Sequence, residues 1–255
     1  MTPAASRRDV FKYAAAAFAG IAATEVLGAP KASAEGLRLI DFAVRLVSPE
    51  QIKAAGFDGA LVYVSELRPG ATFDFKPVTR DYTDGLIAAG LHVVSCYQFG
   101  KPGWPTPSDF TRGFDGGVAD AQTALRLHGA AGGPDSAPIF FSVDEDIAAD
   151  AWKSTASQWF RGINSVLGVE RTGMYGGARQ CSWAVGDGVV GHSTTPGYRW
   201  VWQTRAWSGG VREPAAVLFQ REVVTASDPG QIIDGVSVDV DDVLAPDFGQ
   251  WDLAR

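Results

Sequence analysis

Residues 138–175 read PIFFSVDEDIAADAWKSTASQWFRGINSVLGVERTGMY, and this stretch decides the fold class. It begins with an apolar run, residues 138–143, whose length is typical of a buried strand. A helical pattern follows over residues 148–167 and ends at Gly168, and residues 172–175 form a second apolar run. A strand, a helix and a strand in this order predict two parallel strands joined by a crossover helix.

The same alternation continues in both directions along the chain. Strands are predicted at residues 37–43, 60–65, 91–99, 138–143 and 172–175, and helices at 49–56, 79–89, 118–128, 148–167 and 178–185. Three further strands, at 198–203, 216–220 and 236–240, are separated by short segments that leave little room for helices. Five strand–helix units followed by three strands predict an irregular TIM-like α/β barrel. A doubly wound open sheet is the competing architecture, but no glycine-rich phosphate turn follows Asp41.

Composition and net charge exclude several classes of function. The 255 residues are 46% hydrophobic and 20% charged, which is typical of a globular protein. The formal charge of −7 argues against binding to nucleic acid or to anionic lipid. Two cysteines and three histidines without ligand spacing predict no metal site, and we expect no cofactor. Whether Cys96 and Cys181 form a disulfide is open, because sequence separation says nothing about distance.

The first 34 residues have the pattern of an export signal. Arg7-Arg8 precedes a mildly apolar stretch, residues 13–29, and Ala32-Ser33-Ala34 matches a small-x-small cleavage site. We therefore expect a twin-arginine signal peptide over residues 1–34, the twin-arginine translocase as a partner during export, and one mature domain, residues 35–255. A membrane helix is the alternative, but the stretch is short and mostly alanine. The mature chain has a net charge of −9 and no other apolar run long enough to span a membrane.

Acidic residues stand near the ends of three predicted strands. Asp41 lies near the end of the first strand, Asp144 and Asp146 follow the fourth on the same face as Ser142, and Asp239 and Asp241 share a face of the last strand. Any one of these acids could cap a helix instead. Three strands that deliver carboxylates to one rim predict a site where one acid is protonated beside an ionised partner, as in glycosidic bond cleavage.

Aromatic and amide side chains near the same strand ends are typical of a sugar-binding site. Flat aromatic faces stack on sugar rings, and amides hydrogen-bond to hydroxyl or acetamido groups. We predict that Trp207 is exposed at the rim. The predicted substrate-binding residues are Tyr63, Tyr97, Gln98, Ser142, Asp146, Tyr175, Gln203, Trp207, Gln220 and Asp241.

Several short motifs carry a family resemblance over essentially the whole mature chain. They are Ser95-Cys96-Tyr97-Gln98, Ala137-Pro138-Ile139, Ser142-Val143-Asp144, Arg171-Thr172-Gly173-Met174-Tyr175, Trp202-Gln203, Val238-Asp239-Val240-Asp241 and Phe248-Gly249-Gln250-Trp251. With the twin arginines, this set resembles the glycoside-hydrolase-like domain of twin-arginine-exported proteins of mycobacteria and related actinobacteria. That family is similar to the family-25 muramidases, lysozymes built on a barrel of five strand–helix units and three further strands.

The resemblance to the muramidases implies roles for individual residues. Asp41 matches their first-strand Asp, and Gln220 and Asp239 match a Gln and a Val-Asp-x-Asn motif, with Asp241 in place of the Asn. On the fourth strand the muramidases carry Asp-x-Glu, which aligns with Ser142 and Asp144 by strand position or with Asp144 and Asp146 by charge. Alignment by strand position keeps the preceding apolar strand equally long, and it implies that Asp144 is the general acid.

Three hypotheses follow from these observations. The first is an exported glycoside hydrolase acting on peptidoglycan or another cell-envelope glycan, with Asp144 as general acid and Asp239 or Asp41 stabilising the oxocarbenium-like centre. The second is a catalytically inactive barrel that binds envelope glycan in a structural or regulatory role. The third is a metal-dependent phosphodiesterase whose acids bind Mg²⁺ or Ca²⁺, with His92 as the one histidine that could join them.

Overall fold

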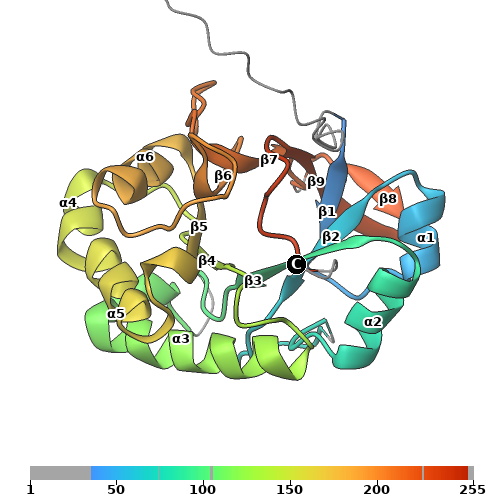
Figure 1. Ribbon diagram of the computed structural model, residues 1–255, viewed down its shortest axis with the longest axis horizontal. Helices are drawn as coiled ribbons and strands as arrows, with labels where there is room; N and C mark the ends of the chain where they lie inside the picture. Colours follow the sequence, from blue (N-terminus) through green and yellow to red (C-terminus); the bar gives the residue numbers. More distant parts are fainter. Residues whose placement is uncertain (1–35, 74, 104–105, 226, 252–255) are drawn as a thin grey trace, which may run out of the picture. The chain divides into compact units, whose positions relative to one another are not determined.

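Eight strands close into a barrel in the computed structural model, which describes residues 36–73, 75–103, 106–225 and 227–251 (Figure 1). Neighbouring strands follow the order β1-β2-β3-β4-β5-β6-β7-β9, and pairing of β1 with β9 closes the ring. The strands are β1 (Arg38–Asp41), β2 (Gly59–Tyr63), β3 (His92–Tyr97), β4 (Ile139–Ser142), β5 (Thr172–Gly176), β6 (Arg199–Thr204), β7 (Ala216–Glu222) and β9 (Val236–Val243). The irregular α/β barrel is therefore confirmed, whereas the predicted signal peptide, residues 1–34, lies outside the described residues.

The last strand differs from the expectation. Strands β1 to β7 run parallel, but β9 is antiparallel to both of its barrel neighbours and forms a hairpin with an extra strand, β8 (Gln231–Ile233). In the β1–β9 register, Asp41 lies opposite Asp239 and Leu39 lies opposite Asp241. Asp239 therefore reaches the rim from the first half of its strand, not from a carboxyl end as predicted.

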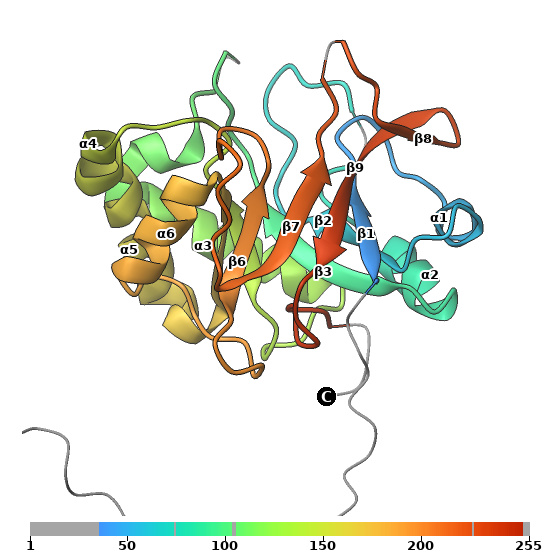
Figure 2. The same cartoon turned by 90° about the horizontal axis from the view of Figure 1, so that it is seen from above.

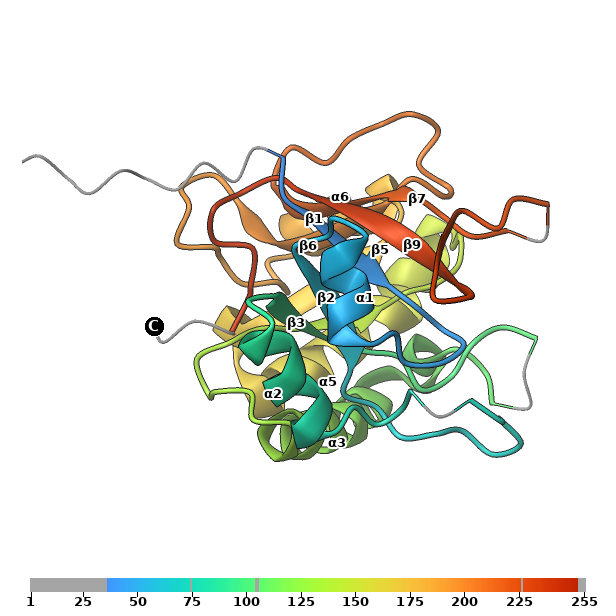
Figure 3. The ribbon, with the colours of Figure 1, turned by 90° about the vertical axis from the view of Figure 1, so that its right-hand side faces the viewer.

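Helices surround most of the barrel, which has its hydrophobic core between strands and helices. They are α1 (Pro49–Ala54), α2 (Arg80–Ala88), α3 (Gly113–Ala130), α4 (Ala149–Ala151), α5 (Ser157–Leu167) and α6 (Ala178–Gly186), with 3₁₀ turns η1 (Asp109–Arg112) and η3 (Val169–Arg171). Figure 3 shows α1 and α2 over the β1–β3 side, and Figure 2 shows β7, β9 and β1 without a helix in front of them. This uncovered side matches the prediction of three last strands without helices between them.

The helix boundaries follow local chemistry. Ser48 and Thr79 accept hydrogen bonds from the backbone N–H groups of Gln51 and Tyr82, so each caps the helix that follows it, and α1 and α2 begin within one residue of their predicted starts. The predicted helix over 148–167 is instead interrupted by a π-helical turn, η2 (Trp152–Ala156). The hydroxyls of Ser154, within this turn, and of Ser157, directly after it, bond to carbonyls four residues earlier, an arrangement that bends helices.

Two glycines let α3 and α5 approach closely. A Cβ added at Gly117 would lie 2.0 Å from the carbonyl oxygen of Trp159, and one at Gly162 would lie 2.1 Å from that of Phe114. The two helix backbones therefore touch directly. This contact seats the wholly buried Trp159 between α3 and the barrel, where its ring packs against Phe141 of β4.

The loops after β1, β2, β3 and β7 project from the same end of the barrel (Figure 3). Because β1 to β7 are parallel, this end carries their carboxyl termini, where the sequence places most of the predicted site.

Candidate active site

Gln220 of β7 connects the acids of two strands. Its Nε2 donates hydrogen bonds to Oδ2 of Asp41 and to Oδ2 of Asp239, both at 2.9 Å. Its Oε1 accepts a 2.8 Å hydrogen bond from the hydroxyl of Tyr175, which ends β5 together with Gly176. Because the tyrosine hydroxyl donates to the amide oxygen, the amide nitrogen must face the carboxylates. Gln220 is thus locked as a donor to both acids.

A third acid lies deeper in the barrel. Asp241 is wholly buried, and its Oδ1 accepts a 2.6 Å hydrogen bond from the indole of Trp202 on β6. Burial first, and the repulsion between Asp41 and Asp241 next, raise the pKa of Asp41 well above its usual value. Burial is also the main cause of the raised pKa of Asp241.

Asp239 is the most solvent-accessible of the three clustered acids, being only half-buried. Burial, followed by the charge of Asp41, raises its pKa to about 8, although the backbone N–H of Val224 donates to its Oδ1 and opposes this rise. The Asp41–Asp239–Asp241 cluster therefore holds protons at neutral pH and carries fewer than three charges. Coupled acids of this kind titrate as a group.

Asp144 follows β4 and interacts electrostatically with the acids of the cluster. Its side chain is 23% exposed, and its Oδ2 accepts a 2.9 Å hydrogen bond from Nε2 of Gln98. Burial raises the pKa of Asp144, whereas Gln98 and then Lys101, whose Nζ lies 3.9 Å from Oδ2, oppose the rise. The negative charge of Asp144 in turn raises the pKa of Asp41 and of Asp239. The four carboxyl groups thus share one electrostatic environment.

The backbone around Gln98 is held by buried polar groups that the sequence did not reveal. Nζ of Lys76 and the hydroxyl of Ser65 donate to the carbonyl of Gln98 at 2.6 and 2.8 Å. The Asp109 carboxylate accepts from the N–H groups of the next two residues, at 2.7 and 2.8 Å. Lys76 is 7% exposed, and burial lowers its pKa to about 8. It lies in an irregular loop after β2, where no periodic pattern distinguishes it.

Two further predicted residues lie at this rim. Tyr63 ends β2 at this rim; burial raises its pKa, and the charges of Asp41 and Asp144 contribute. The Tyr63 ring also packs against Nζ of Lys76, 4.4 Å from the ring centroid. Ser142 is buried at the end of β4, in register with Tyr175. The structure therefore brings together these residues: Asp41, Tyr63, Gln98, Ser142, Asp144, Tyr175, Gln220, Asp239 and Asp241.

Two of the predicted substrate-binding residues point away from this rim. The hydroxyl of Tyr97 donates to Asp120 of α3 at 2.7 Å, outside the barrel. The Gln203 amide donates to the Val211 carbonyl and accepts from the backbone N–H of Glu213, so it supports the loop after β6. Side chains alternate along a strand, and Tyr97 and Gln203 lie on the faces opposite to their neighbours Gln98 and Trp202.

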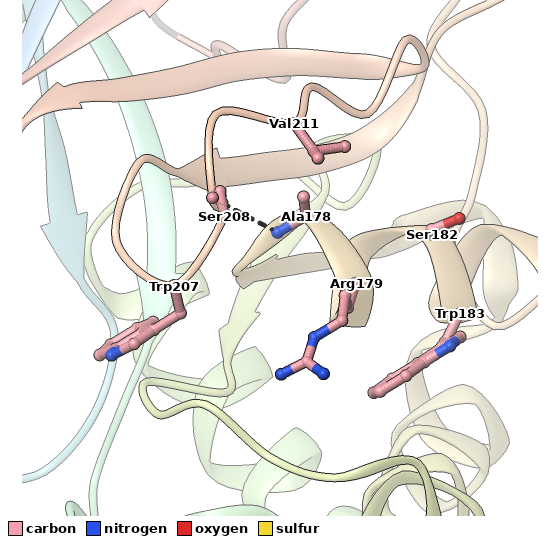
Figure 4. Close-up of a pocket in the computed structure, with 8 residues that line it drawn as sticks. Ala178, Arg179, Ser182, Trp183, Trp207, Ser208 and Val211 are labelled. Atoms are coloured by element: carbon pink, nitrogen blue, oxygen red, sulfur yellow. Dashed lines mark hydrogen bonds between the residues drawn. The ribbon is translucent and has the colours of Figure 1, made fainter.

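Asp146 and Trp207 do not belong to the acid cluster. Asp146 is exposed and forms a 2.5 Å ion pair with Arg179 of α6. Trp207 is 42% exposed, as predicted, and lines a pocket at the start of α6 together with Arg179 (Figure 4).

The remaining chemistry-bearing residues are separate from the cluster. Cys96 and Cys181 are buried free thiols, so they do not form a disulfide. His92 is the first residue of β3, at the opposite end of that strand from the rim, and packs against Phe248. Among the residues that the structure describes, no three His, Cys, Asp or Glu side chains are arranged to hold a metal ion. Within the same residues, no helix is long and apolar enough to cross a membrane.

Comparisons with known proteins agree with this architecture. The family model described as "Rv2525c-like, glycoside hydrolase-like domain" matches residues 50–243. The chain is 37% identical over 253 residues to the "Putative peptidoglycan hydrolase Rv2525c" of Mycobacterium tuberculosis, covering 96% of this chain and 98% of that protein.

Solved structures show the same relationship. The crystal structure of the Mycobacterium tuberculosis Tat-secreted protein Rv2525c in complex with L-tartrate matches with a TM-score of 0.75 and 39% identity, covering 84% of this chain and 98% of that one. The Clostridium perfringens spore cortex lytic enzyme SleM matches with a TM-score of 0.50 and 12% identity, over 80% of this chain and 67% of that one. At such low identity, the second likeness shows a shared fold alone.

Proposed function

The chain belongs to the Rv2525c-like family of glycoside hydrolase-like domains, and from that premise we propose that it is an exported hydrolase of peptidoglycan or a related cell-envelope glycan. The observation that carries the proposal is the hydrogen-bonded unit in which Gln220 joins Asp41 to Asp239, with Asp144 in the same electrostatic environment. Glycoside hydrolysis needs such a division of labour, with one protonated acid and one stabilising carboxylate.

Asp144 acts as the general acid in this proposal. Burial favours its protonated form, and the hydrogen bond from Gln98 occupies Oδ2, which leaves Oδ1 to donate a proton to the glycosidic oxygen. Its partly exposed side chain gives a substrate access to that oxygen. As the bond to the leaving group breaks, positive charge develops on the sugar ring and must be stabilised by the acid cluster.

Asp239 is the member of the cluster that contacts the sugar. It is only half-buried, whereas Asp41 and Asp241 are almost completely covered. Asp239 stabilises the cationic ring as a carboxylate once its proton has passed to solvent, to which its half-buried side chain is open; in its protonated form it instead orients the substrate's acetamido group. Asp41 accepts a hydrogen bond from Gln220, and the buried Asp241 raises the pKa of Asp41, so we assign both acids positioning roles.

A glycan-binding barrel without catalysis is the second candidate. The observation that favours it is the Lys101 ammonium 3.9 Å from Asp144, because a nearby cation stabilises the ionised carboxylate, which cannot donate a proton. Ser142 also supplies a hydroxyl where a second carboxylate would strengthen the case for chemistry.

Hydrolysis assays with Asp144→Asn separate the two candidates. We expect the mature protein to release reducing ends from purified peptidoglycan and the Asp144→Asn variant to lose about 10²- to 10⁴-fold in rate while it still binds. Asp150→Asn is the matched control, because Asp150 is an exposed acid of α4 that belongs neither to the cluster nor to the predicted substrate-binding residues. Binding without cleavage in the wild type, unchanged by Asp144→Asn, would instead establish the glycan-binding role.

Export belongs to the same proposal. The twin arginines and the cleavage site predict passage through the twin-arginine translocase, and the relative from Mycobacterium tuberculosis is described as Tat-secreted. An exported location brings the domain to the envelope glycan that the proposed activity requires.

A further inference from the structure

We propose that a pocket at the start of α6 binds a second, neutral sugar unit of the glycan. This α6 pocket has a volume of about 460 Å³ and is lined by residues that include Arg179, Ser182, Trp183, Trp207, Ser208 and Val211 (Figure 4). Its volume lies within the range of about 300–1,000 Å³ that is typical of small-molecule sites. The inference rests on the proposed function, because it assigns this pocket to the same glycan.

Trp207 is presented to solvent by a braced loop. It is 42% exposed and has a φ of 57°, a left-handed conformation that costs a non-glycine residue about 1–3 kcal/mol. The adjacent Ser208 is buried, and its Oγ accepts from the N–H of Ala178 and from Gln203. Neither the exposure of the indole nor the strain stabilises the fold. Both are accounted for if the indole stacks on a ligand.

Polar groups complete the recognition surface. The Arg179 guanidinium lies 6.0 Å from the ring centroid of Trp183 and pairs with Asp146. Both partners of this ion pair are about half exposed, so the pair is weak and can share its donors and acceptors with a ligand. Indole faces beside adjacent N–H donors and carboxylate acceptors suit a pyranose, which has apolar ring faces and hydroxyls that both donate and accept. The paired charges and the net charge of −9 of the mature chain favour a neutral sugar over an anionic one.

The α6 pocket is tied to the segment that carries the proposed general acid. Gln180 donates through Nε2 to the carbonyl of Glu145 at 3.0 Å, and Arg179 binds Asp146. Two consecutive residues of α6 therefore hold the two residues that follow Asp144. Strand β5, which contains Tyr175, also ends directly before this helix. A glycan with one unit at Asp144 would thus extend along the same rim into the pocket.

Oligosaccharide binding tests the proposal. Titration calorimetry with chitobiose and chitotetraose would use the mature protein carrying Asp144→Asn, so that no ligand is consumed. In this background we expect Trp207→Ala to weaken chitotetraose binding about three- to tenfold, the loss typical of one aromatic contact, and to leave chitobiose binding unchanged. Arg179→Ala should act in the same direction. Phe114→Ala is the control, because this aromatic residue is 46% exposed on α3, outside the pocket.

A second variant guards against a folding defect. Trp207→Gly removes the indole and accepts the positive φ without strain, so it should fold and show the same loss as Trp207→Ala. Folded Trp207 variants that bind chitotetraose as tightly as the background protein would overturn the pocket. Equal weakening for chitobiose would overturn its assignment to a second unit, and absence of chitotetraose binding in the background protein would overturn it altogether. Each of these results is separate from the cleavage assay, which alone decides the proposed activity.

Discussion

Replacement of Asp239 by asparagine should change the stability of the fold in opposite directions at low and high pH. The pKa of Asp239 rises to about 8 in the folded protein, from an ordinary value near 4. The folded state therefore retains a proton that the unfolded state releases as the pH rises through this range, and the free energy of unfolding falls. At about 1.4 kcal/mol per pH unit, the full penalty reaches about 6 kcal/mol above pH 8. Solvent contact and proton sharing with Asp41 reduce this penalty, and we expect about half of it.

Asparagine avoids this penalty at the cost of one hydrogen bond. Its carbonyl oxygen can still accept from Gln220, but its NH₂ then faces the N–H of Val224, which donates to the aspartate in the wild type. A lost hydrogen bond costs about 1 kcal/mol. Asp239→Asn should therefore be about 1 kcal/mol less stable at pH 4.5 and about 2 kcal/mol more stable at pH 8.5.

Equilibrium urea unfolding across this pH range, followed by tryptophan fluorescence, measures the difference. Asp135→Asn is the control, because the Asp135 side chain is 98% exposed and its replacement should leave the pH dependence of the wild type. If Asp239→Asn is destabilised equally at both pH values, the pKa of Asp239 is not raised and the account of the cluster is wrong.

Three further predictions test separate parts of the chain. Lys101→Met removes the cation near Asp144, so the pKa of Asp144 should rise and the alkaline limb of the pH–rate profile should move up by about half a pH unit, the effect of one exposed ion pair. Gly162→Ala should lower the free energy of unfolding by about 1–3 kcal/mol, because its Cβ would meet a carbonyl oxygen of α3, whereas Gly129→Ala, with nothing within 4 Å, should raise it by about 0.5–1 kcal/mol in thermal melts. Replacement of both arginines in the Arg7-Arg8 pair by lysine should leave an unprocessed precursor in the cytoplasm on immunoblots; an exported, trimmed product would contradict the predicted signal.

The barrel could be predicted from spacing because each strand and crossover helix has its own local pattern. The direction of β9 could not, because the segment predicted between the last two strands, residues 221–235, is long enough for a hairpin or for a parallel crossover, and the decision rests on pairing with β1 at the far end of the sequence. The same limit applies to β8, whose three residues carry no periodic pattern. Local boundaries were predictable where a side chain caps the helix, as at Ser48, and not where a π-helical turn interrupts it.

At the candidate site, the sequence did not predict which face of a strand each side chain occupies. Alternation along a strand means that neighbouring residues face opposite sides, so Tyr97 and Gln98 cannot both reach the rim, nor can Trp202 and Gln203. To decide which residue of each pair faces the acids, one must know how neighbouring strands are aligned. This register is a property of the folded sheet. The role of Lys76 could not be predicted for another reason. Its contact with the carbonyl of Gln98 depends on the path of an irregular loop.

The seam between β1 and β9 has a consequence for the timing of folding. It joins Arg38 to Asp242, about 200 residues apart, so β1 leaves the ribosome long before its partner has been synthesised. Contacts of such long range are slow to form, because closing the loop costs conformational entropy before the strand pairing provides any stabilising free energy. Until β9 arrives, β1 and β7 are open strand edges, the kind that pair with other chains. A nascent chain of this protein therefore exposes the edge of β1 for nearly the whole of its synthesis, and the barrel closes only after its last strand has been made.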